Sequence, residues 1–225
     1  MPNPFFQFRQ FTVFQDKCAM KVGTDGTLLG AWAQGGKRIL DIGTGTGLIA
    51  LMMAQRYPEA RVTAIDIDRD ACEQALENIR KSPFSERIKI VNAPLQQFCQ
   101  APFDAIVSNP PFFTNALRNP DEKRSTARHT DTLPFKELFR QTGCLLTADG
   151  TFSAVIPFDC RESFDLEAIL NGFFPWRVCA VKTVAHKPPR RYLLSYGLQP
   201  LPHVETSEIV IRSGEYEKML GDFYL

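Results

Sequence analysis

The segment Ser108-Asn109-Pro110-Pro111-Phe112 combines residue types that suit transfer of a group onto an aromatic amine. Such an amine is a poor nucleophile because its lone pair is delocalised into the ring. Catalysis therefore needs acceptors that hold both amine hydrogens and stabilise the positive charge that develops during in-line transfer. The side-chain oxygen of Asn109 and the carbonyl oxygen of Pro110 can supply both, and Phe112 offers a flat face for an extruded base. The simpler alternative is a proline-rich turn that only ends a strand.

A glycine-rich loop, Asp41-Ile-Gly-Thr-Gly-Thr-Gly47, lies upstream of this motif. It follows a predicted strand and opens a predicted helix, so its backbone can approach a ligand closely and present N–H groups to it. A dinucleotide fingerprint would also need a glycine at position 48, which is Leu48 here, and this argues against NAD. The loop instead resembles motif I of the methyltransferases, in which Asp41 would meet the cationic amino-acid end of S-adenosylmethionine.

Two further segments complete a predicted nucleotide site. Asp66 ends the second predicted strand, where an acid can accept both hydroxyls of a ribose. Asp68 is more typical of a helix cap. Many methyltransferases have an acid after the third strand that binds the cofactor's adenine, and Pro94 occupies that place here. We therefore expect the Ala93 backbone N–H to bind the adenine, with Leu95 against its ring.

The elements that must position these segments alternate between β-rich runs and helical patterns. We predict strands at 38–42, 61–66, 88–91, 104–107 and 151–156. Helices are predicted between them at 48–57, 70–81 and 135–146, with a further short helix between the third and fourth strands. Such alternation indicates a parallel sheet with helices on both faces. The β-rich runs 177–184 and 191–198 are joined by a short loop, which favours an antiparallel pair. The phenylalanines between positions 5 and 14 suit core packing or a lid.

Composition limits the other possibilities. The 225 residues suit one α/β domain, and the net charge of +1 means that any nucleic-acid binding must come from local patches. The six cysteines form no CxxC pair and the three histidines are isolated, so we expect no metal. We find no signal segment and no apolar run near membrane-spanning length, so we expect a cytoplasmic protein, by default a monomer, without membrane contact.

Together these motifs resemble the amino-methyltransferase superfamily, whose Asn-Pro-Pro-aromatic motif acts on adenine N6, cytosine N4 or the amide of glutamine. A more specific resemblance, to the bacterial tRNA1(Val) adenine-37 N6-methyltransferase family, covers nearly the whole chain. It is carried by residues 11–32, 41–47, 109–112, 127–130 and 189–191. The resemblance implies S-adenosylmethionine as cofactor and an adenine in a tRNA anticodon loop as target.

The resemblance also implies a fold. We expect an α/β, doubly wound protein whose mostly parallel, seven-stranded methyltransferase sheet ends in an antiparallel C-terminal hairpin. Residues 1–225 would form one domain, with residues 1–34 as an extension that packs on the core and covers cofactor and substrate. Within it, Lys21 to Asp25 would lie over the cofactor. The candidate cofactor-binding residues are therefore Lys21, Thr24, Asp25, Asp41, Gly43, Gly45, Asp66, Ala93, Leu95 and Asn109.

Basic residues gather in two predicted loops that could contact RNA phosphates. One loop follows the acceptor motif and the other lies within the late hairpin. The candidates are Arg118, Lys123, Arg124, Arg128, His129, Lys187, Arg190 and Arg191. The alternative is solvated loop charge with acidic neighbours. His129 is better suited to ordering the loop or contacting RNA than to acting as a base, because the amine loses its proton readily once it is methylated.

Three other functions remain open at this point. A protein glutamine methyltransferase shares the Asn-Pro-Pro-aromatic motif, but such enzymes resemble a core with Tyr in the last place and a separate helical domain. A noncatalytic RNA-binding module on the same fold is opposed by the intact glycine loop and acceptor motif. A dehydrogenase is weakened by Leu48.

Overall fold

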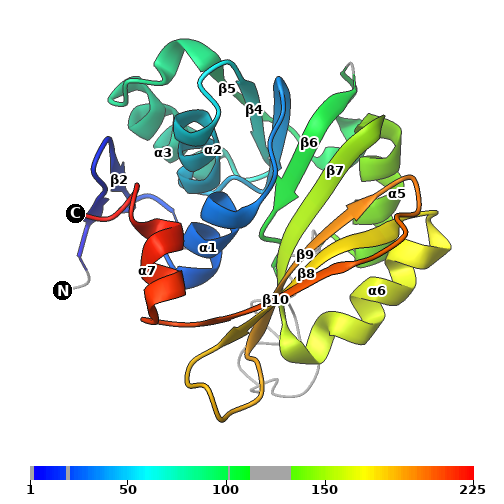
Figure 1. The fold of residues 1–225 in the computed structure, drawn as a ribbon. Coiled ribbons are helices and arrows are strands. Elements are labelled where there is room, and N and C mark those ends of the chain that lie inside the picture. The colour runs from blue at the N-terminus through cyan, green and yellow to red at the C-terminus, as the bar shows by residue number, and fades with distance from the viewer. Residues whose placement is uncertain (1–2, 19–20, 101, 112–132) are drawn as a thin grey trace, which may run out of the picture.

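The computed structural model describes residues 3–18, 21–100, 102–111 and 133–225. Within them the main sheet has eight strands in the order β10-β8-β9-β7-β6-β3-β4-β5 (Figure 1). Five of these strands are β3 (Arg38–Ile42), β4 (Arg61–Asp66), β5 (Ile88–Asn92), β6 (Phe103–Ser108) and β7 (Leu146–Pro157). These five strands are mutually parallel, as the alternation of strands and helices predicted.

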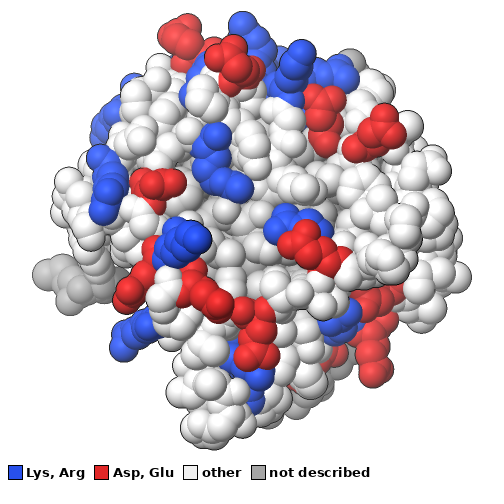
Figure 2. Space-filling model, viewed as in Figure 1, with Lys and Arg blue, Asp and Glu red and all other residues white. Residues whose placement is uncertain are grey.

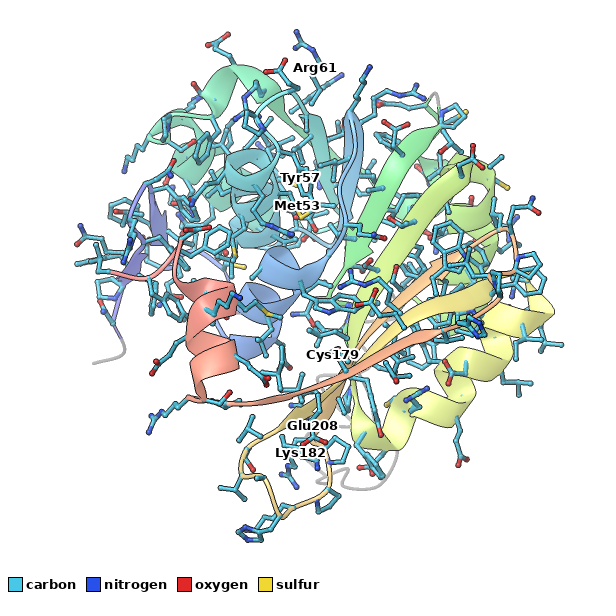
Figure 3. All side chains as sticks on the ribbon, in the orientation of Figure 1. Met53, Tyr57, Arg61, Cys179, Lys182 and Glu208 are labelled. Atoms are coloured by element: carbon cyan, nitrogen blue, oxygen red, sulfur yellow. The ribbon has the colours of Figure 1, made fainter. Side chains whose placement is uncertain are left out.

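The late hairpin is also confirmed. It consists of β8 (Phe174–Lys182) and β9 (Arg191–Gly197), and β9 runs antiparallel to both β7 and β8. The predicted seven strands are all present, but an eighth, β10 (Glu205–Val210), adds to the edge parallel to β8. Lys182 Nζ and Glu208 Oε2 form an ion pair of 2.7 Å across this pair of strands (Figure 3). The mostly parallel α/β fold with an antiparallel C-terminal pair is therefore correct, with one more strand than expected.

Helices cover both faces of the sheet (Figure 1). On one face lie α1 (Thr24–Trp32), α2 (Leu48–Arg56), α3 (Arg69–Arg80) and α7 (Gly214–Leu220), whose buried side chains share a core with the N-terminal segment. On the other face lie α5 (Phe135–Leu145) and α6 (Arg161–Leu170), together with the short 3-10 helix η2 (Leu95–Gln97). The remaining 3-10 turns are η1 (Ser85–Arg87) and η4 (Phe158–Cys160).

The N-terminal segment packs onto the core. Its short strands β1 (Phe5–Gln7) and β2 (Thr12–Phe14) form an antiparallel pair outside the main sheet. Phe8 and Phe11 are buried and their rings stack at 4.7 Å, so these two side chains serve core packing. Arg9 N donates to the carbonyl of Phe223, which ties this segment to the C-terminal end.

Basic and acidic side chains are interspersed on the face in Figure 2, and neither sign gathers into one large patch. Among the described residues, no helix is long and apolar enough to cross a membrane. In the same part of the chain, no three His, Cys, Asp or Glu side chains gather as metal ligands would.

Candidate active site

The glycine loop joins β3 to α2 and has a backbone that only glycine adopts easily. Gly43, Gly45 and Gly47 have φ angles of 71°, 55° and 82°, in the left-handed region where a Cβ is costly. A Cβ at Gly43 would meet no atom within 4 Å, so this position opens onto free space. Gly43 N and Thr44 N donate to the carbonyl of Ile65 at 2.9 and 3.0 Å, which fastens the loop to β4.

Asp41 holds this loop from beneath. Its side chain is completely buried, and its Oδ2 accepts hydrogen bonds from Thr44 Oγ1 at 2.6 Å and Ala50 N at 3.1 Å. Burial raises the pKa of Asp41 to about 7. The residue lines neither of the two cavities described below. The carboxyl group joins the loop to the first turn of α2 through its Oδ2, and the predicted contact with the amino-acid end of a cofactor stays a prediction.

Two cavities meet along the glycine loop. The smaller, of about 320 Å³, is lined by Lys21, by Thr24 and Asp25 at the start of α1, and by the loop itself. The larger, of about 840 Å³, is lined by the ends of β3, β4 and β6 and by the segment after β5. Gly43, Gly45 and Asn109 line both cavities. The smaller cavity thus contains the residues predicted for the cofactor's methionine end. The larger, adjoining cavity contains those predicted for its nucleoside end.

Asp66 stands between the glycine loop and the larger cavity. Its Oδ2 accepts from Gly45 N at 2.8 Å and its Oδ1 accepts from Asp68 N at 2.9 Å. Burial raises the pKa of Asp66. Each carboxylate oxygen has a second lone pair, so Asp66 can still accept hydroxyl hydrogens from the cavity. The predicted cap is confirmed, because Asp68 accepts from Asp70 N at the start of α3.

The prediction that the Ala93 backbone N–H binds the cofactor's adenine is wrong. Its backbone N–H donates to the carbonyl of Asp66 at 3.0 Å. The cause is the parallel register of β4 and β5, in which Asp66 pairs with Asn92 and the hydrogen-bond ladder continues one residue further. Ala93 lines the larger cavity, but its N–H is already used by the sheet. Leu95 lies in the cavity wall as expected.

The sequence did not indicate Ile67, Cys18 or Glu137, which also line the larger cavity. Ile67 is 51% exposed, unusual for a large apolar side chain beside a buried strand, and it shares the cavity wall with Leu95. Its place directly after Asp66 was the available signal. Hydrogen bonds from Arg140 and Gln141 lower the pKa of Glu137 to about 2, so this carboxylate stays ionised.

The acceptor motif leaves β6 beside the glycine loop. Ser108 pairs with Ile42 in the sheet register, and its buried hydroxyl donates to the carbonyl of Ile42 at 2.9 Å. This bond fixes the point at which Asn109 leaves the sheet. Asn109 lines both cavities, and Pro110 and Pro111 line the larger one. Phe112, Arg118, Lys123, Arg124, Arg128 and His129 lie outside the described residues.

The N-terminal segment is coupled to the glycine loop through α3. Asn78 Nδ2 donates to the carbonyl of Phe14 at 2.8 Å and to that of Thr46 at 2.9 Å. Its Oδ1 accepts from Phe14 N at 2.9 Å. Lys21 Nζ donates to the carbonyl of Gln15. The buried side-chain amide of Asn78 thus links β2 to the glycine loop.

The start of β9 in the late hairpin lies at the end of the sheet where the parallel strands finish. Arg191 forms an ion pair with Asp25 and lies at the start of β9. Lys187 and Arg190 are exposed in the connecting loop, which projects away from the sheet in Figure 1. Of the three basic residues predicted here, Arg191 is thus engaged in the site and the other two face solvent.

This arrangement, a glycine loop beside an acid and an Asn-Pro-Pro motif on a mostly parallel sheet, is that of a methyltransferase. Residues 22–174 match the model of the methyltransferase small domain family. Solved structures with the same fold include a predicted O-methyltransferase from Agrobacterium tumefaciens (TM-score 0.69, 16% identity, 88% of this chain and 96% of that chain). Another is a glycopeptide N-methyltransferase in complex with S-adenosyl-L-methionine (TM-score 0.59, 11% identity, 80% of this chain and 100% of that chain).

More similar relatives define the family. A protein of Phocaeicola vulgatus is 50% identical over 100% of this chain and 99% of its own length, and one of Parabacteroides distasonis is 47% identical over the same shares. A third, from Trichodesmium erythraeum, is 42% identical over 98% of this chain and 97% of its own. All three are named tRNA1(Val) (adenine(37)-N6)-methyltransferase. The chain belongs to this family.

Proposed function

We propose that the protein transfers the methyl group of S-adenosylmethionine to the N6 amine of adenine 37 in tRNA1(Val), the reaction for which its relatives are named. The observation that carries this proposal is the position of Asn109. It is the one described residue outside the glycine loop that lines both cavities. An acceptor at this junction can hold a target amine where the cofactor's methyl group is presented.

The residues present fit S-adenosylmethionine. The larger cavity offers Asp66 as acceptor for ribose hydroxyls and the apolar side chains of Ile67 and Leu95 for the faces of an adenine. The smaller cavity offers Lys21 to a carboxylate and Asp25 to an ammonium group. When bound, the cofactor supplies an electrophilic methyl group on a sulfonium. Gly43 leaves the backbone open to the ligand, because no atom occupies the space of its missing Cβ.

The chain's own part in the reaction is to hold the target amine. We infer that Asn109 Oδ1 and the carbonyl oxygen of Pro110 accept the two amine hydrogens and stabilise the positive charge that grows on N6. The nitrogen held in this way would take the methyl group from the sulfonium, which would leave as the neutral thioether, and would release one hydrogen as a proton to solvent water. Phe112 remains a predicted stacking partner for the extruded adenine.

RNA would approach from the edge at which the parallel strands end. Lys187 and Arg190 lie exposed in the hairpin loop at that edge and are suited to phosphate contacts. The predicted contacts from Arg118, Lys123, Arg124, Arg128 and His129 belong to the same proposal. A tRNA substrate also places the protein in the cytoplasm.

The experiment is nucleoside mass spectrometry of bulk tRNA from a deletion strain, with methylation of that tRNA by the purified protein. The proposal expects N6-methyladenosine to disappear from tRNA1(Val) in the strain and to return after incubation with protein and S-adenosylmethionine. An unchanged nucleoside profile, or methylated glutamine in a release-factor peptide as the only product, would contradict it.

A further inference from the structure

An exposed aromatic surface lies where β7 ends. Phe158, in η4, is 46% exposed, and its ring stacks on that of Tyr192 with 6.0 Å between centroids and 23° between planes. Among the described residues, Phe158 is one of three phenylalanines with such exposure. A single exposed apolar side chain is common at a protein surface, so its fixed position, its aromatic neighbour and the charges around it have to identify a ligand.

The position of this surface is fixed by several contacts. Phe158 N donates to the carbonyl of Arg190 at 3.2 Å. The guanidinium of Arg161 lies 4.4 Å from the centre of the Tyr192 ring, and its Nε is 2.9 Å from Asp165 Oδ2. Asp165 in turn accepts from the hydroxyl of Tyr196, which is buried in the core. The aromatic pair therefore needs little ordering before it binds a partner, which favours affinity.

The surface and the acceptor motif follow neighbouring strands of the sheet. Ser108, the last residue of β6, pairs with Ala154 of β7. The β7 strand continues to Pro157, which is about 10 Å further at the usual rise per residue. Phe158 thus follows the strand next to the one that delivers Asn109. The same face of the sheet carries α5, whose first residue, Phe135, packs against Phe164 of α6 with 4.8 Å between ring centres.

The charges around Phe158 favour a base over a phosphate. Arg190 and Arg161 supply positive charge, but Asp159 is also exposed in the same turn. A carboxylate beside the ring repels a phosphate. A neutral base can stack on the ring whatever the sign of the charges nearby. Phosphates further along the chain can still meet Arg190.

We propose that Phe158, supported by Tyr192, forms a stacking surface for a nucleotide that flanks the target adenine. This proposal rests on the proposed function and adds a substrate-binding residue to it. When the target adenine is extruded, its neighbours lose their stacking partner, and an aromatic side chain beyond the end of the adjacent strand replaces that partner. The RNA is thereby held in the opened form that the reaction requires.

The test is single-turnover methylation of an anticodon stem-loop RNA by the full-length protein. Phe158→Ala should lower kcat/KM for this RNA by roughly 5- to 150-fold, the usual effect of removing one base–aromatic stack. Phe158→Trp should keep the wild-type value, and Phe158→Leu should behave like Phe158→Ala, because it keeps apolar volume but loses the flat face. The matched control is Phe174→Ala. Phe174 is 40% exposed and pairs with Gly197, at the end of β9 far from Arg191. S-adenosylmethionine affinity should be unchanged in every variant.

A second set of substrates separates stacking from other roles. Abasic nucleotides replace the neighbour on the 5′ side or the 3′ side of the target adenine. For one of these RNAs, kcat/KM with the wild-type protein should fall to the value that Phe158→Ala shows on intact RNA. On that same abasic RNA, Phe158→Ala should have no lower kcat/KM than the wild type. Wild-type kcat/KM in Phe158→Ala, or additive losses on both abasic RNAs, would overturn the proposal. If the wild-type protein methylates no RNA, the proposed function itself fails, which is a different result.

Discussion

Arg191 at the start of β9 reaches Asp25 at the start of α1, with 2.8 Å between Arg191 Nε and Asp25 Oδ2. The two residues are 166 positions apart in the sequence, and Asp25 lines the smaller cavity. The hairpin proposed to meet RNA is therefore joined to the wall of the proposed cofactor site. Arg191 and its neighbour Arg190 should consequently have different roles.

We predict that Arg190→Ala weakens RNA binding and flattens its salt dependence by about 0.7 to 0.9 units of slope, as loss of one phosphate contact does. Arg191→Ala should change the salt slope less and should instead alter S-adenosylmethionine affinity, because Asp25 loses its partner. Fluorescence titration of RNA at several salt concentrations, with calorimetry of the cofactor, measures both. Equal salt slopes for the two variants would contradict this division of roles.

Asp41 should make stability depend on pH. Burial raises its pKa from 3.8 to about 7 in the folded protein, so the folded state keeps a proton in this range that the unfolded chain has lost. The free energy of unfolding should therefore fall as pH rises from about 4 to about 7, at most by a few kcal/mol, at about 1.4 kcal/mol per pKa unit.

Urea denaturation of the wild type and of Asp41→Asn across this range isolates the effect from other titrating groups. The substituted amide never ionises, so the variant should gain stability relative to the wild type as pH rises. A difference in unfolding free energy that stays constant from pH 4 to pH 8 would show that Asp41 does not titrate there.

Much of the fold was predictable because its central strands are buried runs between helices with a clear apolar side. The β10 strand was missed because its first four residues are all exposed and carry no alternating pattern. The α6 helix was missed because Leu166, Ile169 and Leu170 are exposed on it, while Phe164 and Ala168 are buried, so its apolar residues do not form one stripe.

The candidate site was predictable where a motif fixes a local backbone, as at Gly43 and Asn109. It was not predictable where strand register or long-range pairing decides. The use of the Ala93 N–H by the sheet depends on how β5 aligns with β4. The pairing of Asp25 with Arg191 depends on contacts between segments that no local pattern connects.

Asp66 should contribute to cofactor affinity. Asp66→Ala should weaken S-adenosylmethionine binding about ten- to a hundredfold, which corresponds to roughly 1.5–3 kcal/mol for lost hydrogen bonds to a charged group. The matched control is Asp104→Ala, because Asp104 lines neither cavity and accepts from Arg38 N at the start of β3, so its loss should leave cofactor affinity unchanged. Calorimetry on both folded variants decides it, and unchanged affinity in Asp66→Ala would remove this residue from the cofactor site.

The central claim is that Asn109 holds the target amine at the junction of the two cavities. Its most direct test is the single-turnover rate of methyl transfer to tRNA1(Val) by Asn109→Ala, with S-adenosylmethionine affinity measured on the same preparation. We predict that the rate falls by about 10²–10³, the usual effect of losing one preorganised hydrogen-bonding group, while cofactor affinity stays nearly intact. Any residual product should be N6-methyladenosine. A rate equal to that of the wild type would contradict the proposed role of Asn109.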